Sequence, residues 1–463
     1  MTDAAVLACA VAVVAGARSA SAPVAIVVAV GLAVAVRAAD PDARRWMAVV
    51  IVVAGTVAGE RGAHEHERLG PRQLGPYDGP VQIVGEPRRH GDAVRAVLRI
   101  DGERYETWTR GAPAEVVERW RGGEHVEVRG ERRAFTDARG ARVAWQHVVG
   151  RFVLDDPREL VARVPGGADG APVARPVDRA SNAVRASVER GAAVLPAPDD
   201  ALFRGLVIGD RRGQPDAMIE RFRASGLSHL TVVSGLNVAL LLAAAAPGLR
   251  RLRPFARWAV TILLVAWFAS LTRFEPSIMR AGAMAALSAT AFVTGRDRAP
   301  FRLLCLAVAG LVLVDPLLVH ATGFWLSVGA TVGVCTVGPW IAHRLPGPRA
   351  VAGPIGITVG AQIGVAPPLI ATFGHLPLVS VPANLAAVPV ASVVKLYGLP
   401  ASLVAGWVPP LAEPLMLPCR VGVRWVDTVA ARAATAEPSG AWPWIGWLVF
   451  LGAVGVVVAR DRR

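Results

Sequence analysis

Charge is scarce in this chain of 463 residues. Charged side chains make up 19% of the sequence, against roughly 25% in soluble globular domains, while hydrophobic residues make up 53% and the mean hydropathy is +0.43. An apolar fraction this high excludes disordered and collagen-like chains. It also argues against an ordinary soluble enzyme. The composition predicts a membrane protein that carries one polar insertion.

Cysteine and metal-binding motifs are equally scarce. The four cysteines lie in or beside apolar segments and none forms a CxxC pair, so neither a zinc site nor a disulfide framework is predicted: Cys9, Cys305, Cys335 and Cys419. The one metal-like local motif, His64-Glu65-His66, fits a solvated charged face better than a metal site. No GxxxxGK[ST] loop occurs, which excludes ATP hydrolysis by that route. We therefore expect neither a metal nor a cofactor.

The net charge of +14 is unevenly distributed along the chain. Residues 1–59 carry +1, residues 60–226 carry +2, and residues 227–463 carry +11. The polar insertion is therefore nearly neutral, and the excess lies in short loops between apolar segments. Two explanations are open: the positive-inside rule of membrane proteins, which we favour, and a DNA-binding charge patch.

Apolar and polar stretches divide the chain into four regions. Residues 1–59 contain three apolar stretches and predict N-terminal membrane helices, without a cleaved signal peptide. Residues 60–157 predict a small β domain, and residues 158–225 an amphipathic helical connection. Residues 226–463 contain the remaining apolar stretches, which brings the expected total to ten or eleven membrane segments. The predicted fold class is a polytopic α-helical membrane protein with an inserted β-barrel.

The arginines favour one orientation in the cell membrane. Loops 247–257, 295–302 and 342–350 are rich in basic residues, and strict alternation of the spans puts all three in the cytoplasm. The polar region before residue 227 is then extracytoplasmic. The number of passes made by the Pro-rich stretch Leu378–Trp407 stays open; if it makes two passes or a re-entrant pair, Arg460, Arg462 and Arg463 also lie in the cytoplasm.

The β domain has the pattern of a small OB-like barrel. Apolar and polar residues alternate over Val94–Ile100, and the turn Asp101-Gly102 leads into a second run, Tyr105–Thr109. Three further short runs bring the count to about five strands, as in OB-type barrels: Val81–Val84, Val126–Val128 and Val143–Val149.

Two tryptophans of this domain are candidates for nucleic-acid contacts. Trp108 and Trp145 could stack against bases, as aromatic side chains of such barrels often do. The alternative is that both belong to the barrel core. Beyond the barrel, apolar residues recur at helical spacing from Ala180 to Ala192, which predicts a helix that ends before Pro196.

A polar cluster interrupts the apolar stretch that begins at Leu227. On a regular helix His229, Asn237 and Ser234 would lie at about 0°, 80° and 140°, so that one face could carry all three. Alternatively, Ser234-Gly235 breaks the helix and exposes backbone donors to a passing anion. A third explanation is hydrogen bonding between helices. Hydrolysis at Ser234 is disfavoured because His229 would not face it and no acidic residue is nearby.

A second polar cluster begins a later apolar segment. Pro276 suits the first turn of a helix, with Ser277 next to it, and Arg280 would lie inside that helix near its outer end. There it could attract phosphates at a pore mouth, or simply pair with Glu275. With the Pro-broken run that ends at Asn384, these residues favour a transport pathway over a plain structural bundle.

The motifs of the C-terminal half resemble those of the ComEC family of competence proteins. The core of the likeness is Gly226-Leu227-Ser228-His229-Leu230 followed by Val233-Ser234-Gly235-Leu236. Later landmarks occur in the same order: EPSIMRAGAM at 275–284, DPLLVHATGFWLSVGA at 315–330 and APPLIATFGHLPLVSVPANLAAVPV at 366–390. The layout of helices followed by an OB-like domain also fits, so the resemblance covers nearly the whole chain.

The resemblance implies a channel of the cytoplasmic membrane that passes single-stranded DNA during natural transformation. It places these residues along the path: His229, Ser234, Asn237, Pro276, Ser277, Arg280 and Asn384. Asn237 departs from the family, which usually has His there. No HxHxDH nuclease motif occurs either, so we expect no enzymatic activity. The expected partners are single-stranded DNA, membrane lipid, an extracytoplasmic DNA receptor, a cytoplasmic helicase and a separate nuclease. The alternative function is transport or export of another polar or anionic solute.

Overall fold

The chain forms two compact units in a computed structural model. The first comprises Met1–Val184 with Cys305–Ala321, and the second comprises Arg185–Leu304 with Thr322–Arg463. The structure describes residues 3–452 apart from 20, 40–44, 137–138, 155–175, 298, 439, 441, 444 and 450–451. The sequence also predicts a last apolar segment, Trp442–Val458, and its second half lies mostly outside the described residues.

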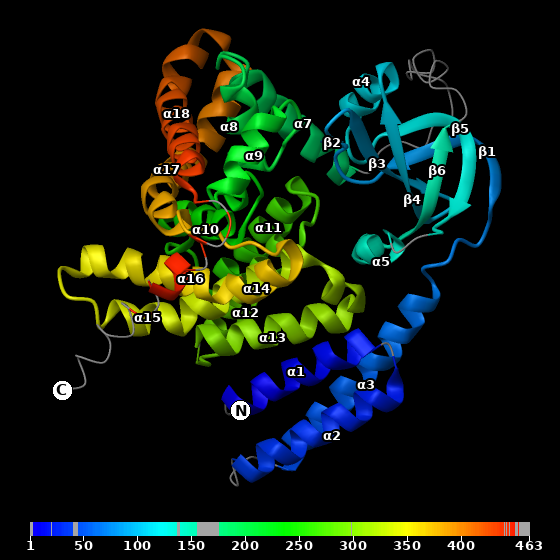
Figure 1. Ribbon diagram of the computed structural model, residues 1–463, viewed down its shortest axis with the longest axis vertical. Helices are drawn as coiled ribbons and strands as arrows, with labels where there is room; N and C mark the ends of the chain where they lie inside the picture. The colour runs from blue at the N-terminus through cyan, green and yellow to red at the C-terminus, as the bar shows by residue number, and fades with distance from the viewer. Residues whose placement is uncertain are drawn as a thin grey trace. The chain divides into compact units, whose positions relative to one another are not determined.

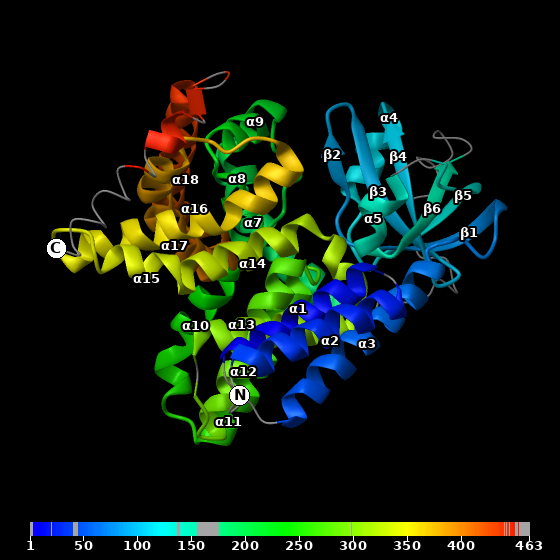
Figure 2. The same ribbon diagram turned by 60° about the horizontal axis from the view of Figure 1, so that its bottom comes forward.

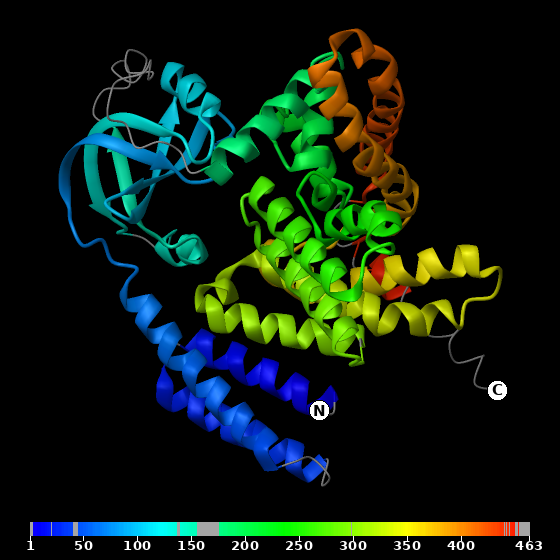
Figure 3. The same cartoon turned by 180° about the vertical axis from the view of Figure 1, so that it is seen from behind.

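Three helices begin the first unit, coloured dark blue in Figure 3: α1 (Asp3–Ser19), α2 (Ala22–Ala39) and α3 (Arg45–Glu67). Their contact is made by small residues, including buried Ala5, Ala12 and Ala29. A Cβ atom on Gly16 would come within 2.4 Å of the Gly55 carbonyl oxygen, so the backbones of α1 and α3 touch. Small residues permit this close approach of helices, as is common inside membranes.

The polar region folds into a small five-stranded β-barrel (Figure 1). The six-stranded sheet has the order β1-β5-β6-β4-β3-β2, and an additional pairing of β1 with β3 closes five of these strands into a ring, while the short β2 pairs with β3 outside it. Most neighbours are antiparallel, but β4 and β6 are parallel. The strands are β1 (Gly75–Ile83), β2 (Arg88–His90), β3 (Ala93–Ile100), β4 (Glu103–Arg110), β5 (His125–Ala134) and β6 (Val148–Leu154). Helix α4 (Ala112–Arg119) lies between β4 and β5 in the chain.

The predicted hairpin is confirmed, and the predicted last strand is partly wrong. Asp101 and Gly102 have φ of 51° and 86°, as the tight turn between β3 and β4 requires. Residues 143–147, however, are not extended. Val143 is the last residue of α5 (Arg139–Val143), a 3₁₀ turn follows as η1 (Ala144–Gln146), and β6 begins only at Val148. A short apolar run does not distinguish a helical turn from a strand, and here only its second half pairs with the sheet.

Three helices of the polar connection follow the barrel: α7 (Pro176–Ala192), α8 (Asp199–Ile208) and α9 (Asp216–Ala224). The predicted amphipathic helix is therefore present from residue 176 and ends before the prolines. Its apolar residues Val188 and Ala192 are buried.

The rest of the chain is almost entirely helical. Among the described residues, four helical stretches are long and apolar enough to cross a membrane: Pro254–Leu271, Thr322–Ala342, Arg349–Phe373 and Ser380–Trp407. Shorter apolar helices are Pro23–Val36, Gly235–Leu249 and Pro300–Val314. The elements are η2 (Ser228–Leu230), α10 (Gly235–Leu249), α11 (Pro254–Leu271), α12 (Pro276–Val293), α13 (Pro300–Val314), η3 (Pro316–His320), α14 (Thr322–Cys335), α15 (Val337–Ala342), α16 (Arg349–Phe373), α17 (Ser380–Trp407), η4 (Pro409–Leu411) and α18 (Ala412–Ala436).

The Pro-rich stretch, which the sequence left open, forms a single helix. Two passes and a re-entrant pair are both ruled out, because α17 is one continuous helix of 28 residues. Pro389 and Pro400 lie inside it without ending it. At 1.5 Å per residue the helix is about 42 Å long, enough for a single pass through a bilayer. Prolines are tolerated where neighbouring elements satisfy the freed backbone groups.

Helices α14 and α15 pack against α16 (Figure 2). Glycines line this contact and form a seam. A Cβ atom on Gly333 would lie 1.9 Å from the Gly360 carbonyl oxygen, and one on Gly364 would lie 2.0 Å from that of Gly329. Gly338 and Gly356 continue the contact. The helices therefore touch backbone to backbone, with no room for a side chain between them.

Candidate functional site

The polar cluster after residue 226 breaks the helix instead of lining one face of it. The turn η2 ends at Leu230, and α10 begins only at Gly235, after Ser234 with an extended backbone (φ −126°, ψ 171°). The one-face arrangement of His229, Asn237 and Ser234 is therefore wrong, and the alternative break at Ser234-Gly235 is confirmed. The first N–H groups of a helix lack partners within it, so this break presents backbone donors.

A buried cation lies against the first turn of α10. The Lys395 ammonium, on α17, donates to Asn237 Oδ1 at 3.1 Å, and the Ser234 hydroxyl donates to the same oxygen at 3.4 Å. Lys395 is 6% exposed and Asn237 is 5% exposed. Within the part of the chain that the structure describes, no carboxylate lies within 4.0 Å of the Lys395 ammonium. The hydrogen-bond partner of Lys395 on α10 is thus a neutral amide and not a carboxylate.

A second buried cation lies at the same turn. Arg280 on α12 is 5% exposed, and its Nε donates to Ser327 Oγ at 2.8 Å while Nη1 contacts Met284 Sδ at 3.0 Å. A Cβ atom on Gly235 would lie 2.8 Å from Arg280 Nη2, so the guanidinium lies directly against the first residue of α10. The alternative pairing with Glu275 is wrong, since no described carboxylate lies within 4.0 Å of this guanidinium.

The remaining predicted residues fall into two groups. Ser277 belongs to the break, because its hydroxyl donates to the Val233 carbonyl oxygen at 2.7 Å. Pro276, the first residue of α12, sets the start of the helix that carries Ser277 and Arg280.

His229 and Asn384 lie at the other end of the break. His229 is exposed, and its Nδ1 lies 3.2 Å from the Gly226 carbonyl oxygen. A Cβ atom on Gly226 would lie 2.7 Å from Ser380 Cβ, and the Asn384 amide donates to the Ser380 carbonyl oxygen at 2.7 Å. Ser234 and His229 are thus not paired with each other: the Ser234 hydroxyl donates to the Asn237 amide oxygen, and the His229 ring contacts a backbone carbonyl.

Sequence reasoning missed Lys395, although a signal was available. It is the only lysine of the chain and the only charged residue of α17. A mean hydropathy over the segment hides one charge among many apolar residues. A charge inside an apolar span is costly, however, so it marks a functional site by default.

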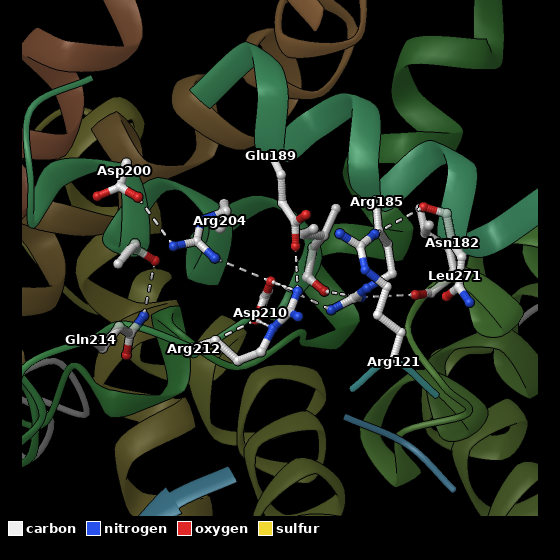
Figure 4. Close-up of polar contacts among 12 residues, drawn as sticks. Arg121, Asn182, Arg185, Glu189, Asp200, Arg204, Asp210, Arg212, Gln214 and Leu271 are labelled. Carbon is white, nitrogen blue, oxygen red and sulfur yellow. Dashed lines mark hydrogen bonds and ion pairs between the residues drawn. The ribbon is translucent and has the colours of Figure 1, made fainter. Parts of the chain in front are cut away.

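A network of ion pairs surrounds Asp210, in the loop between α8 and α9 (Figure 4). The Asp210 side chain is fully buried and lies 2.6 Å from Arg212, 3.3 Å from Arg204 and 3.9 Å from Arg185. Burial alone would raise the pKa of this carboxyl, but the hydrogen bond and charge of Arg212, with the charges of Arg185 and Arg204, bring the pKa well below its usual value. Glu189 contacts Arg212 as well.

This network stabilises the loop that packs against the helix break before α10. Gly209 ends α8 with φ 69°, and a Cβ atom there would lie 2.2 Å from Val233 Cγ2. The Asn237 amide donates to the Leu206 carbonyl oxygen at 3.5 Å. Arg185 donates to the carbonyl oxygens of Ile208 and Leu271 at 3.3 and 3.2 Å. The ion pairs thus fix the loop against which the break packs.

The barrel tryptophans have different surroundings. Trp108 is half-buried; its ring centroid is 5.3 Å from that of His90 and 4.4 Å from the Arg139 guanidinium carbon. Arg139 also pairs with the fully buried Glu106 at 2.6 Å. Trp145 is half-buried in η1. Base stacking by either tryptophan stays a prediction.

The site and the comparisons with known proteins define the class. A family profile described as "Competence protein" matches residues 206–463, more than half of the chain. The chain therefore belongs to the competence protein family.

Two curated relatives match part of the chain. The uncharacterized protein YcaI of Escherichia coli (strain K12) is 26% identical over 235 residues, 48% of this chain and 31% of its own length. ComE operon protein 3 of Bacillus subtilis (strain 168) is 28% identical over 201 residues, 42% of this chain and 25% of its own length. The matches thus span about a third and a quarter of these relatives. No solved structure matches.

Proposed function

We propose that the protein is a channel of the cell membrane that passes single-stranded DNA into the cytoplasm during natural transformation. Membership of the competence family supports a role in DNA uptake. The observation that carries the channel is the pair of buried cations, Lys395 and Arg280, on either side of the first turn of α10.

Physical chemistry favours an anion at this place. A buried charge without a partner costs several kcal/mol or more, so two such cations at one helix start call for a negative ligand. The backbone N–H groups of the first turn add donors, and the helix dipole adds positive potential. A phosphodiester chain supplies one negative charge per nucleotide, each of which can occupy the site in turn.

The neutral groups of the site suit passage better than retention. Asn237, Ser234 and Ser277 offer hydrogen bonds without a fixed negative charge that would compete with the phosphate. A conduction site must bind strongly enough to admit its solute and weakly enough to release it. Broken helices that present their N-termini to anions near the bilayer midplane are typical of transporters.

The barrel offers a surface on which single-stranded DNA could bind outside the cell. Its closed ring of five strands fits the OB type, which binds oligonucleotides in many proteins. We propose that it faces outward, that Trp108 and Trp145 contact DNA, and that the chain itself degrades none. A DNA receptor, a cytoplasmic helicase and a separate nuclease would then act with it.

Substitution of the lysine tests the proposal. Lys395→Met keeps the length of the side chain and removes the charge, so we expect uptake of labelled DNA to fall at least tenfold while membrane abundance stays unchanged. Lys395→Arg should restore part of the uptake. Arg250→Gln removes an exposed positive charge from the same unit and serves as the matched control. Normal uptake by Lys395→Met would refute the proposed path.

A second function, transport of another anionic solute, is favoured by the same cations. Purified protein in liposomes distinguishes the two. Passage of an oligonucleotide that Lys395→Met abolishes supports the DNA channel. Passage of small organic phosphates or carboxylates, with no oligonucleotide passage, supports the alternative.

A further inference from the structure

The first unit contains a cavity of about 640 Å³ between the end of α3 and the barrel. Four arginines line it. Arg68 and Arg72 come from the link that follows α3, and Arg99 and Arg104 come from the β3–β4 hairpin. His147, at the start of β6, lines it as well. The cavity belongs to neither of the sites described above.

The arginines of the hairpin are placed against each other. Arg99 and Arg104 are direct cross-strand partners in the β3–β4 register, and like charges in such positions destabilise a hairpin. Arg104 Nη1 donates to the Gln146 carbonyl oxygen at 2.8 Å, and no carboxylate of the described chain lies within 4.0 Å of this guanidinium. Burial, and then the charge of Arg99, lower the pKa of Arg104, and the charge of Asp315 offsets this only in part. A counter-charge in the cavity would relieve both effects.

The two carboxylates that line the cavity are already engaged. Glu103 accepts a hydrogen bond from the Tyr105 hydroxyl at 2.8 Å and pairs with Arg72 at 3.6 Å. Glu65 pairs with Arg68 at 3.6 Å and lies 3.9 Å from His147. Four arginines against two carboxylates leave an excess of two positive charges around the cavity.

Helix α3 indicates the level of the cavity relative to the bilayer. Its apolar part ends at Gly59, and the same helix continues to Glu67. At 1.5 Å per residue, Glu65 lies about 9 Å beyond the apolar end. The headgroup layer on each side of a bilayer is roughly 5–7 Å thick. Glu65 thus lies about 2–4 Å outside the headgroup layer, and if α1–α3 cross the membrane, the long arginine side chains that line the cavity extend back to the lipid phosphates.

We propose that this cavity binds the phosphodiester headgroup of an anionic phospholipid and thereby holds the barrel at the membrane surface. The proposal rests on the membrane location of α1–α3 and not on DNA passage. Each arginine near an anionic membrane contributes about 1 kcal/mol, so two together correspond to about thirtyfold in affinity.

The test uses the full chain, stripped of lipid in a neutral detergent. Native mass spectrometry measures binding of short-chain phosphatidylglycerol, with phosphatidylcholine, inorganic phosphate and a single-stranded oligonucleotide as separate arms. We expect phosphatidylglycerol to bind and phosphatidylcholine to bind far more weakly. The double variant Arg99→Gln/Arg104→Gln should bind phosphatidylglycerol about thirtyfold more weakly. The matched control is Arg110→Gln/Arg129→Gln, which removes two exposed arginines from the same barrel.

Three outcomes would overturn the proposal. The first is equal affinity of the double variant and the wild type for phosphatidylglycerol. The second is binding of the oligonucleotide or of inorganic phosphate, but not of the lipid, at this cavity. The third is an equal loss in the control variant. Failure of the DNA channel is seen separately, as normal DNA uptake by Lys395→Met, because that residue lies in the other unit.

Discussion

Asn in place of Asp210 removes one charge from the centre of the ion-pair network and keeps the size of the side chain. In the wild type this carboxylate is fully buried among Arg185, Arg204 and Arg212. Breaking a buried ion pair by removing one partner typically costs about 3–5 kcal/mol, because the remaining charges stay buried without compensation. For a unit of 150–250 residues this lowers the melting temperature by about 6–20 °C.

The matched control is Asp200→Asn. Asp200 pairs with Arg204 at 3.1 Å, but its side chain is 28% exposed, so this pair should contribute at most about 1 kcal/mol. Thermal melting of both variants in detergent, followed by intrinsic fluorescence, gives the comparison. Equal melting temperatures for Asp210→Asn and Asp200→Asn would refute the reasoning, since they would show that burial of the network adds nothing.

The same network predicts a pH dependence. The pKa of Asp210 is lower in the folded state than in the unfolded chain, so its contribution is complete above the unfolded value of about 3.9. The contribution falls as the pH drops below that value toward the lower folded pKa. Between pH 5 and 8 the difference in stability between wild type and Asp210→Asn should therefore stay constant, and below about pH 4 it should shrink.

Three further predictions concern orientation and the path. In a cysteine-free background, Asp92→Cys should react with an impermeant maleimide in intact cells and Arg251→Cys should not; the reverse pattern would invert the proposed topology. Ser234→Leu should reduce DNA uptake without loss of abundance, because a more apolar segment inserts at least as well; a parallel loss of melting temperature would indicate a structural role instead. Amine-reactive labelling of Lys395, read by peptide mass spectrometry, should be slowed by bound oligonucleotide; unchanged labelling would remove it from the path.

Local sequence patterns predicted the structure correctly where a single local interaction determines it. The turn Asp101-Gly102 fixes its hairpin because both residues tolerate positive φ. The break before α10 was one of several outcomes compatible with the sequence, because a serine and a glycine also occur within regular helices. Only tertiary contacts decide it: Arg280 lies against Gly235, and Ser277 holds the Val233 carbonyl.

Two features of the structure, the continuous helix α17 and the contact of Lys395, could not be predicted for the same physical reason. Prolines at 389 and 400 interrupt a helix only if their surroundings do not satisfy the freed backbone groups, and the sequence of α17 does not report those surroundings. The contact of Lys395 with Asn237 could not be predicted, because the two residues are 158 positions apart in the chain. Long-range partners of this kind are not visible in local periodicity.

The glycine seam between α14–α15 and α16 has a genetic consequence. Every single-base change that replaces a glycine introduces a residue with a Cβ atom, and at Gly333 or Gly364 that atom would collide with the facing backbone. Alanine, elsewhere the mildest replacement, is thus excluded along with the larger residues. Most positions in apolar helices accept a range of similar side chains, but these accept none. A random mutational scan should therefore show the seam as two narrow, matching bands of intolerance, one on each side of the contact.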